Sequence, residues 1–95
     1  MKLPLVFDMT TTRPEFRRLL PAAVGHAPFA EVNGAFVHAD GARRWRIELE
    51  PLPRLSIGLI RLECHRVGFD FRGYSAGEIA DFMARFELHF RRGGG

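Results

Sequence analysis

Cysteine is nearly missing from this chain of 95 residues, because Cys64 is its single thiol. No internal disulfide can form, which excludes the disulfide-stapled class of small secreted domains. A lone free thiol also suits a reducing compartment. Long apolar runs are missing too: none approaches the roughly 18 residues that a membrane span needs. The first residues hold an apolar run shorter than the ~7–15 residues of a secretory signal, so we expect a cytoplasmic protein without a membrane partner.

The chain also lacks residue patterns that typically hold a metal ion or carry out catalysis. No histidine pair has ligand spacing, and no glycine-rich phosphate loop opens a helix. Cys64 and His65 are adjacent and would point to opposite faces of a strand, so we interpret His65 as a surface histidine in a turn. Glu48 and Glu50 alternate with arginines, which is typical of a solvated strand face. We therefore expect no metal, no cofactor and no catalytic residue, and we favour a non-enzymatic role.

What the chain does have is an ordinary globular composition with an aromatic bias. Hydrophobic residues make up 46% and charged residues 26%, and nine Phe stand against one Trp and one Tyr. This length supports one modest core, so we expect a single domain over residues 1–92, followed by a flexible glycine tail at 93–95. The net charge of +3, with thirteen of fourteen basic residues being Arg, is only weak evidence for a polyanionic partner.

Two capping boxes predict the starts of two helices. Thr12 stands three residues before Glu15, and Ser75 three residues before Glu78. Each is followed by apolar residues at helical spacing, namely Phe16, Leu19, Leu20 and Ala23 in the first case and Ile79, Phe82, Met83, Phe86 and Phe90 in the second. Pro21 predicts that the first helix kinks or stops near Leu20, and the second helix should run to Arg92.

Six segments are predicted to be extended, and they cover residues 3–8, 29–32, 35–38, 43–50, 54–62 and 66–72. Asn33-Gly34 predicts a type I′ hairpin turn, and Asp40-Gly41 repeats the signal. Pro51-Leu52-Pro53 should end the fourth segment, and a bend near Glu63–His65 should separate the last two. Pro4 favours a place for the first segment at the edge of a sheet.

The resulting order is β-α-β-β-β-β-β-α, which favours an α+β fold with an antiparallel meander of five to six strands and both helices on one face. Two-residue hairpin loops would place Phe36 opposite Trp45 on the helix-covered face. The order of residues 66–71 keeps only part of the aromatic third-strand motif of RNA-recognition domains. We interpret Val67, Phe69 and Phe71 instead as core beneath the last helix.

The other sheet face should stay open, and function is expected there. It would carry Ala30, Val32, Ala35, Val37, Arg44, Arg46, Glu48 and Ile60. Small apolar residues mixed with Arg are typical of interfaces. The main hypothesis is therefore an accessory or interaction protein that forms a homodimer, or binds a protein partner, through the open face or an edge strand.

Two alternatives stay open. The first is nucleic-acid binding through the arginines Arg43, Arg44, Arg46, Arg54, Arg61 and Arg72, which would bind phosphates. The second is a small-molecule pocket between sheet and helices, lined by Met83 and phenylalanines, although such a pocket would compete with the core for the same side chains.

Overall fold

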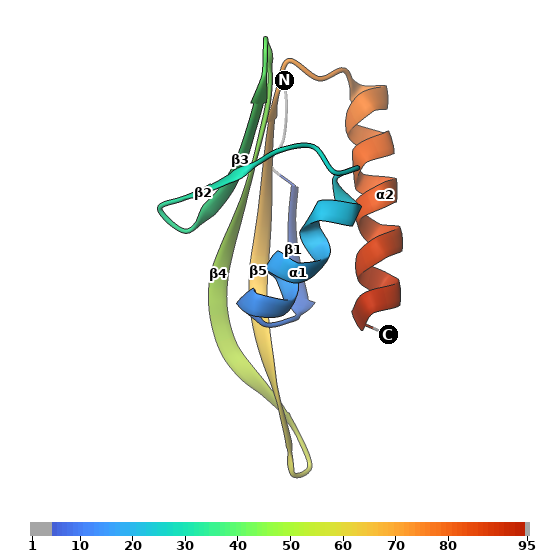
Figure 1. The fold of residues 1–95 in the computed structure, drawn as a ribbon. Coiled ribbons are helices and arrows are strands. Elements are labelled where there is room, and N and C mark those ends of the chain that lie inside the picture. Colours follow the sequence, from blue (N-terminus) through green and yellow to red (C-terminus); the bar gives the residue numbers. More distant parts are fainter. Residues whose placement is uncertain (1–4, 95) are drawn as a thin grey trace.

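The computed structural model describes residues 5–94 as a single sheet with helices on one side (Figure 1). The elements in chain order are β1 (Leu5–Thr10), α1 (Arg13–Ala23), β2 (Ala30–Val32), β3 (Ala35–Asp40), β4 (Arg43–Ile57), β5 (Ile60–Arg72) and α2 (Ala76–Gly94). All neighbouring strands are antiparallel, in the order β1-β5-β4-β3-β2. The predicted α+β class, with an antiparallel sheet and two helices on one face, is confirmed, with five strands.

Both helices begin at the predicted capping residues. The Thr12 hydroxyl accepts a hydrogen bond from the Glu15 amide, and Ser75 and Glu78 exchange reciprocal bonds between side chain and backbone. Of the kink or stop expected near Leu20, the stop does not occur. Although Pro21 has no N–H to donate to Arg17, α1 continues to Ala23, and the amide of the C-cap residue Val24 donates to the Leu20 carbonyl.

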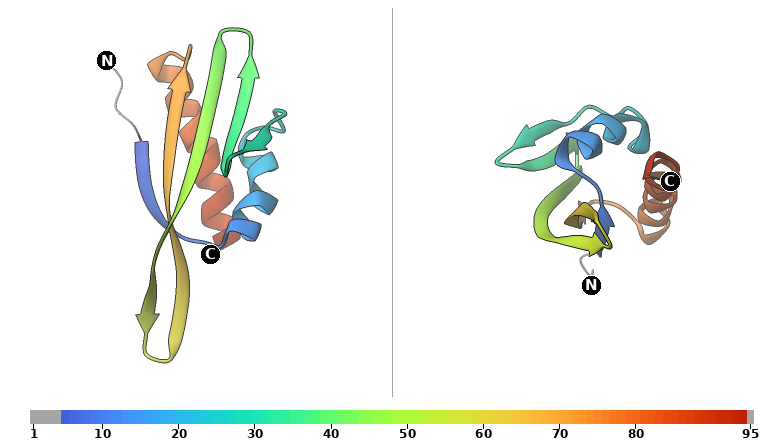
Figure 2. Two further views of the ribbon diagram at one scale, coloured as in Figure 1. Left: turned by 90° about the vertical axis from the view of Figure 1, so that its left-hand side faces the viewer. Right: turned by 90° about the horizontal axis from the view of Figure 1, so that it is seen from below.

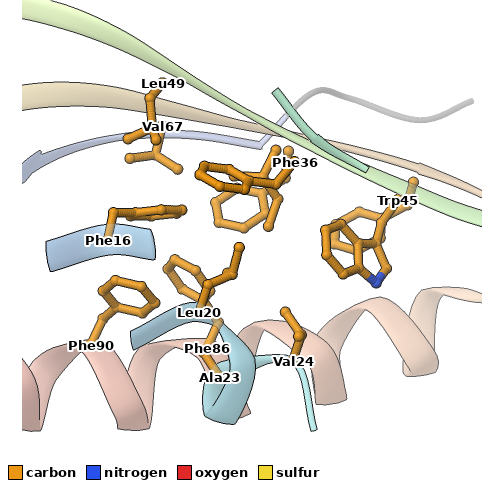
Figure 3. Close-up of a cluster of buried hydrophobic side chains, with 13 residues drawn as sticks. Phe16, Leu20, Ala23, Val24, Phe36, Trp45, Leu49, Val67, Phe86 and Phe90 are labelled. Atoms are coloured by element: carbon orange, nitrogen blue, oxygen red, sulfur yellow. The ribbon is translucent and has the colours of Figure 1, made fainter. Parts of the chain in front are cut away.

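The core lies between the sheet and the helices, as the apolar stripes predicted (Figure 3). Phe16 and Leu20 of α1 are fully buried, and Phe86 and Phe90 of α2 are nearly so. The phenyl ring of Phe16 lies 5.6 Å from that of Phe36 and 4.8 Å from that of Phe90, so it connects α1 to the sheet and to α2. The sheet contributes Phe36, Trp45, Ile47, Leu49, Val67, Phe69 and Phe71. The predicted core role of the last three residues is confirmed.

The first hairpin has the predicted turn, and the second differs by its loop. Asn33 and Gly34 both have positive φ, as a type I′ turn requires. The second loop is Gly41-Ala42 instead of Asp40-Gly41, so Phe36 lies opposite Ile47 and not Trp45. Because the offset between strands is two residues, every side chain keeps its predicted face.

Two of the predicted breaks between strands are absent from the structure, one after residue 50 and one near residues 63–65. Segments 43–50 and 54–62 were expected to be separate, but β4 runs without a break through Pro51 and Pro53 to Ile57, and β5 runs from Ile60 to Arg72. Proline is tolerated there because β3 pairs with β4 only up to Glu48, so no described strand needs an N–H from that side. The reversal that was expected near residues 63–65 takes place at Gly58-Leu59 instead.

His65 accordingly lies inside β5 and not in a surface turn. It is 4% exposed, and its Nδ1 lies 2.8 Å from the Thr11 carbonyl oxygen, to which it donates a hydrogen bond. This bond fixes the link between β1 and α1 against the sheet. β1 is an edge strand, as expected, but it covers Leu5–Thr10, and the predicted Leu3 and Pro4 lie outside the described residues. α2 extends two residues past the predicted Arg92 to Gly94, and Gly95 lies outside the described residues.

Candidate interaction surfaces

The far ends of β4 and β5 form a two-stranded ribbon that projects past the C-terminal end of α2 (Figures 1 and 2). We call residues 52–64 the hairpin arm, and the rest of the described chain the body. Leu52 pairs with Cys64 at the base of the arm, and Ile57 pairs with Ile60 at its tip. The arm gives the molecule its length of 47 Å, against 27 and 26 Å in the other two directions.

One face of the arm is entirely apolar. Cross-strand partners share a face of a ribbon, and so do residues two apart along a strand. The pairs Leu52–Cys64, Leu55–Leu62 and Ile57–Ile60 therefore line one side. Leu55, Ile57 and Ile60 are 46%, 58% and 61% exposed, and Leu59 in the turn is fully exposed. Large aliphatic side chains gather here on a part of the sheet that neither helix reaches.

The opposite face of the arm is polar. Ser56, Arg61 and Glu63 lie there, and Arg54 stands in the bulge between Leu52 and Leu55. Pro53 shares this bulge, and Pro51 lies just before the arm on the same unpaired edge of β4. Proline and bulges weaken a strand edge as a template for further strand pairing. The arm is therefore an amphipathic ribbon whose apolar face, more than its edge, is suited to contact.

The outer face of the body carries the residues expected on the open sheet face. Val32 is 45% exposed, whereas Ala35 is buried, at 1% exposed, although it shares that face with Glu48. Ion pairs within the chain occupy many charges of this face, including Arg46–Glu48 at 2.6 Å and Arg66–Asp8 at 3.0 Å. Arginines paired in this way have less to offer a partner.

The structure divides the six candidate arginines among three places. Arg44, Arg46 and Arg72 lie together on the outer face of the body, where Arg44 is directly opposite Arg72. Arg54 and Arg61 lie on the arm. Arg43 lies on the helix side, where its guanidinium forms an ion pair with Glu78 and stands 5.5 Å from the centre of the Tyr74 ring. The set does not form one continuous basic surface.

A hollow of about 650 Å³ lies beside the first group of arginines. Phe29, Val37 and Ala39 contribute apolar walls, and the His38 ring stacks on Trp45 at 5.4 Å between ring centres. A second hollow, of about 420 Å³, lies at the base of the arm between the end of β1 and residues that include Leu52, Leu55 and Cys64. The interior between sheet and helices, where a ligand pocket was one alternative, is filled by the aromatic side chains of the core.

Acidic groups of the body are held by arginines and helix caps. The Glu31 carboxylate accepts two hydrogen bonds of 2.9 Å from Arg17, and Arg13 approaches it at 3.4 Å, so the pKa of Glu31 is lowered, mainly by the bond from Arg17. The pKa of Glu78 is lowered first by the backbone amide of Ser75 in the capping box. Burial raises the pKa of Tyr74. The pKa shifts of Glu31 and Glu78 thus have structural causes. The first comes from the ion pairs that attach β2 to α1, and the second from the capping box that begins α2.

The arm was missed from the sequence because residues 54–62, which include its turn, were predicted as one extended segment. The signal was available: Leu55-Ser56-Ile57 and Ile60-Arg61-Leu62 alternate on both sides of Gly58-Leu59. Within residues 5–94 there is no cluster of three or more His, Cys, Asp or Glu side chains placed to hold a metal ion. Among the same residues, neither helix is long and apolar enough to cross a membrane.

Comparison with known proteins adds no assignment to these surfaces. The chain matches no protein-family model, and it has no significant match among curated proteins or among solved structures.

Proposed function

We propose that this protein is a non-enzymatic interaction module that forms a homodimer through the apolar face of the hairpin arm. The observation that carries the proposal is the one-sided ribbon itself, with Leu55, Ile57 and Ile60 about half exposed or more. A two-stranded hairpin is at best marginally stable in water unless something packs against its apolar face. Contiguous exposed apolar patches of this kind mark interaction sites.

A second copy of the chain is the occupant that the arm fits best. In a two-fold dimer the same patch meets itself, so the apolar side chains of both arms are covered by one contact. The polar face carries Arg61 beside Glu63, together with Arg54 and Ser56, and so has no strong charge of one sign that would select a polyanion. Pro51 and Pro53 disfavour pairing through the β4 edge, which directs association to the face.

The outer face of the body, where self-association was first expected, supports the proposal less well. Its charges are engaged within the chain in Arg46–Glu48 and Arg66–Asp8 pairs. Nucleic-acid binding is also supported less well, because the candidate arginines lie on different sides of the molecule.

Sedimentation velocity over a range of protein concentrations tests the dimer. We expect the wild type to be dimeric at high concentration and the double variant Ile57→Ser/Ile60→Ser to stay monomeric. Because both side chains are exposed, the variant should keep its fold, which circular dichroism would verify. The matched control is Val32→Ser, which removes an exposed aliphatic side chain from the outer face of the body and should leave the dimer intact.

Three results would overturn the proposal. A wild-type protein that stays monomeric at every concentration would exclude self-association. A dimer that dissociates in Val32→Ser but not in the arm variant would move the interface to the open face of the body. Binding of the wild type to lipid vesicles, without dimer formation, would assign the arm to a membrane surface instead.

A further inference from the structure

The hollow beside Arg44, Arg46 and Arg72 is a second candidate site, separate from the arm. It lies at the edge of the sheet beside residues 38–40 of β3, which no longer pair with β2, and it is lined from both sides of that edge. Val37, Ala39, Arg44 and Arg72 belong to the outer face, whereas His38 and Trp45 belong to the helix-covered face. Its volume of about 650 Å³ is within the range of small-molecule sites. Binding in this hollow would not require dimer formation.

Two positive charges face each other at the rim of this hollow. Arg44 and Arg72 are direct cross-strand partners, and like charges in that position are destabilising. Arg44 has no carboxylate partner within residues 5–94, and the carboxylate of Asp70 is 3.9 Å from Arg72, at the limit of an ion pair. The sheet thus keeps a repulsive pair that a bound anion would relieve.

The walls of the hollow next to these guanidinium groups are apolar. Val37 and Ala39 contribute carbon surface from β3, and Phe29 contributes it from the segment before β2. His38 forms a rigid part of the wall, because its ring stacks on Trp45 and its Nδ1 lies 2.5 Å from the Pro28 carbonyl oxygen. Since a carbonyl only accepts, Nδ1 carries the proton in this bond.

From this arrangement we infer that the hollow binds a small organic anion, with a carboxylate or phosphate head between Arg44 and Arg72 and an apolar body against Phe29, Val37 and Ala39. Arginine suits the head because its planar fork binds such oxygens through two parallel hydrogen bonds. A polyanion such as single-stranded RNA fits less well. Asp70 and the Arg46–Glu48 pair interrupt the basic surface, and Trp45, the aromatic residue of β4 beside these arginines, is 3% exposed and so offers little ring face for stacking.

The test uses phenyl phosphate as the probe and the amide spectrum of the full chain labelled with ¹⁵N. We expect saturable shifts at Ala39, Arg44 and Arg72. Inorganic phosphate, which has the head alone, and benzyl alcohol, which has the body alone, should each bind more weakly. Arg44→Gln should lower the affinity for phenyl phosphate by about tenfold or more, as loss of a hydrogen bond to a charged group implies. The matched control is Arg54→Gln, which removes an arginine from the arm and should change nothing.

A second readout reports on the repulsive pair. Arg44→Glu places a carboxylate opposite Arg72, so we expect it to abolish binding of phenyl phosphate while raising the urea midpoint of the free protein.

Three outcomes would overturn the inference. Shifts that fail to saturate, or that are equal in Arg44→Gln and Arg54→Gln, would exclude the site. Equal affinity for inorganic and phenyl phosphate would exclude the role of the apolar walls. Tight, strongly salt-dependent binding of a short single-stranded RNA without binding of phenyl phosphate would assign the arginines to a nucleic acid.

Discussion

Body and arm are built from the same two strands, β4 and β5, and differ in what covers their apolar side chains. In the body, Ile47 and Val67 point toward the helices and are fully buried. In the arm, Ile57 and Ile60 are 58% and 61% exposed. The alternation of apolar and polar residues continues from one half to the other, but the apolar residues change face. In β5 the helix-covered face of Val67 continues into His65, Glu63 and Arg61, whereas Ile60, Leu62 and Cys64 continue the outer face of Arg66. The apolar residues of the arm are therefore exposed because they lie on the face that carries no helix, and because the strands continue past the C-terminal end of α2 (Figure 2).

The largest expected contrast compares one ring in the body with one side chain in the arm. Phe16→Ala should destabilise the protein by about 3–5 kcal/mol, because a buried ring in contact with Phe36, Phe86 and Phe90 leaves a cavity. Leu59→Ala, at the fully exposed tip, should change the free energy of unfolding by less than about 0.5 kcal/mol. Urea unfolding measures both, and similar values would mean that the arm is as well packed as the body.

His65 marks the place where the body ends. His65→Ala should cost about 1–3 kcal/mol, because the buried Thr11 carbonyl loses its hydrogen-bond donor. Cys64→Ser, at the neighbouring and partly exposed position, is the control and should have a smaller effect. Urea unfolding at a protein concentration low enough to exclude dimers gives both values, and a neutral His65→Ala would show that the link between β1 and α1 does not need this bond.

Acid should loosen the edge of the body. The pKa of Glu31 is lowered by Arg17 from its ordinary value of 4.5, so the stability that this carboxylate contributes is present above that value and is lost as the pH falls through the lower folded pKa. Glu31→Gln should lower the thermal midpoint at neutral pH. The difference from the wild type should disappear in acid, and a constant difference at all pH values would exclude an electrostatic cause.

The smallest expected effect is a difference in hydrogen exchange, which leaves global stability unchanged. It locates the boundary between body and arm residue by residue. In dilute protein we expect the amides of residues 53–63 to exchange faster than those of Ile47 and Val67, because only the latter are covered by helices. Protection of the arm should then rise with protein concentration while that of the body stays constant. Uniform protection at low concentration would erase the distinction between the two regions.

The sequence predicts the body better than the arm, and the reasons are local. Capping boxes and apolar stripes identify α1 and α2, because each pattern has its own physical cause in hydrogen bonding or burial. Pro51 and Pro53 misled the strand assignment, because proline stops a strand only where a neighbour needs its N–H, and the neighbour's length is a tertiary property. His65 was misplaced because a bend was expected at residues 63–65, between two segments that β5 in fact joins.

The candidate sites depended even more on tertiary structure. The six arginines were grouped by residue type, but only the pairing of β4 with β5 places Arg44 opposite Arg72 and moves Arg43 to the helix side. Phe29 joins the hollow through the path of the chain into β2, which no periodic pattern indicates.

The position of β1 has a consequence for the order of folding. Its only described strand partner is β5, so Leu5 meets Phe69 across most of the chain. α1 likewise packs beside α2, through Phe16 and Phe90. During synthesis the first strand and helix therefore leave the ribosome long before their partners exist, whereas β3, β4 and β5 can pair with near neighbours as soon as each emerges. The meander should form the nucleus, and the N-terminal segment should wait, exposed to chaperones, until the last helix is made.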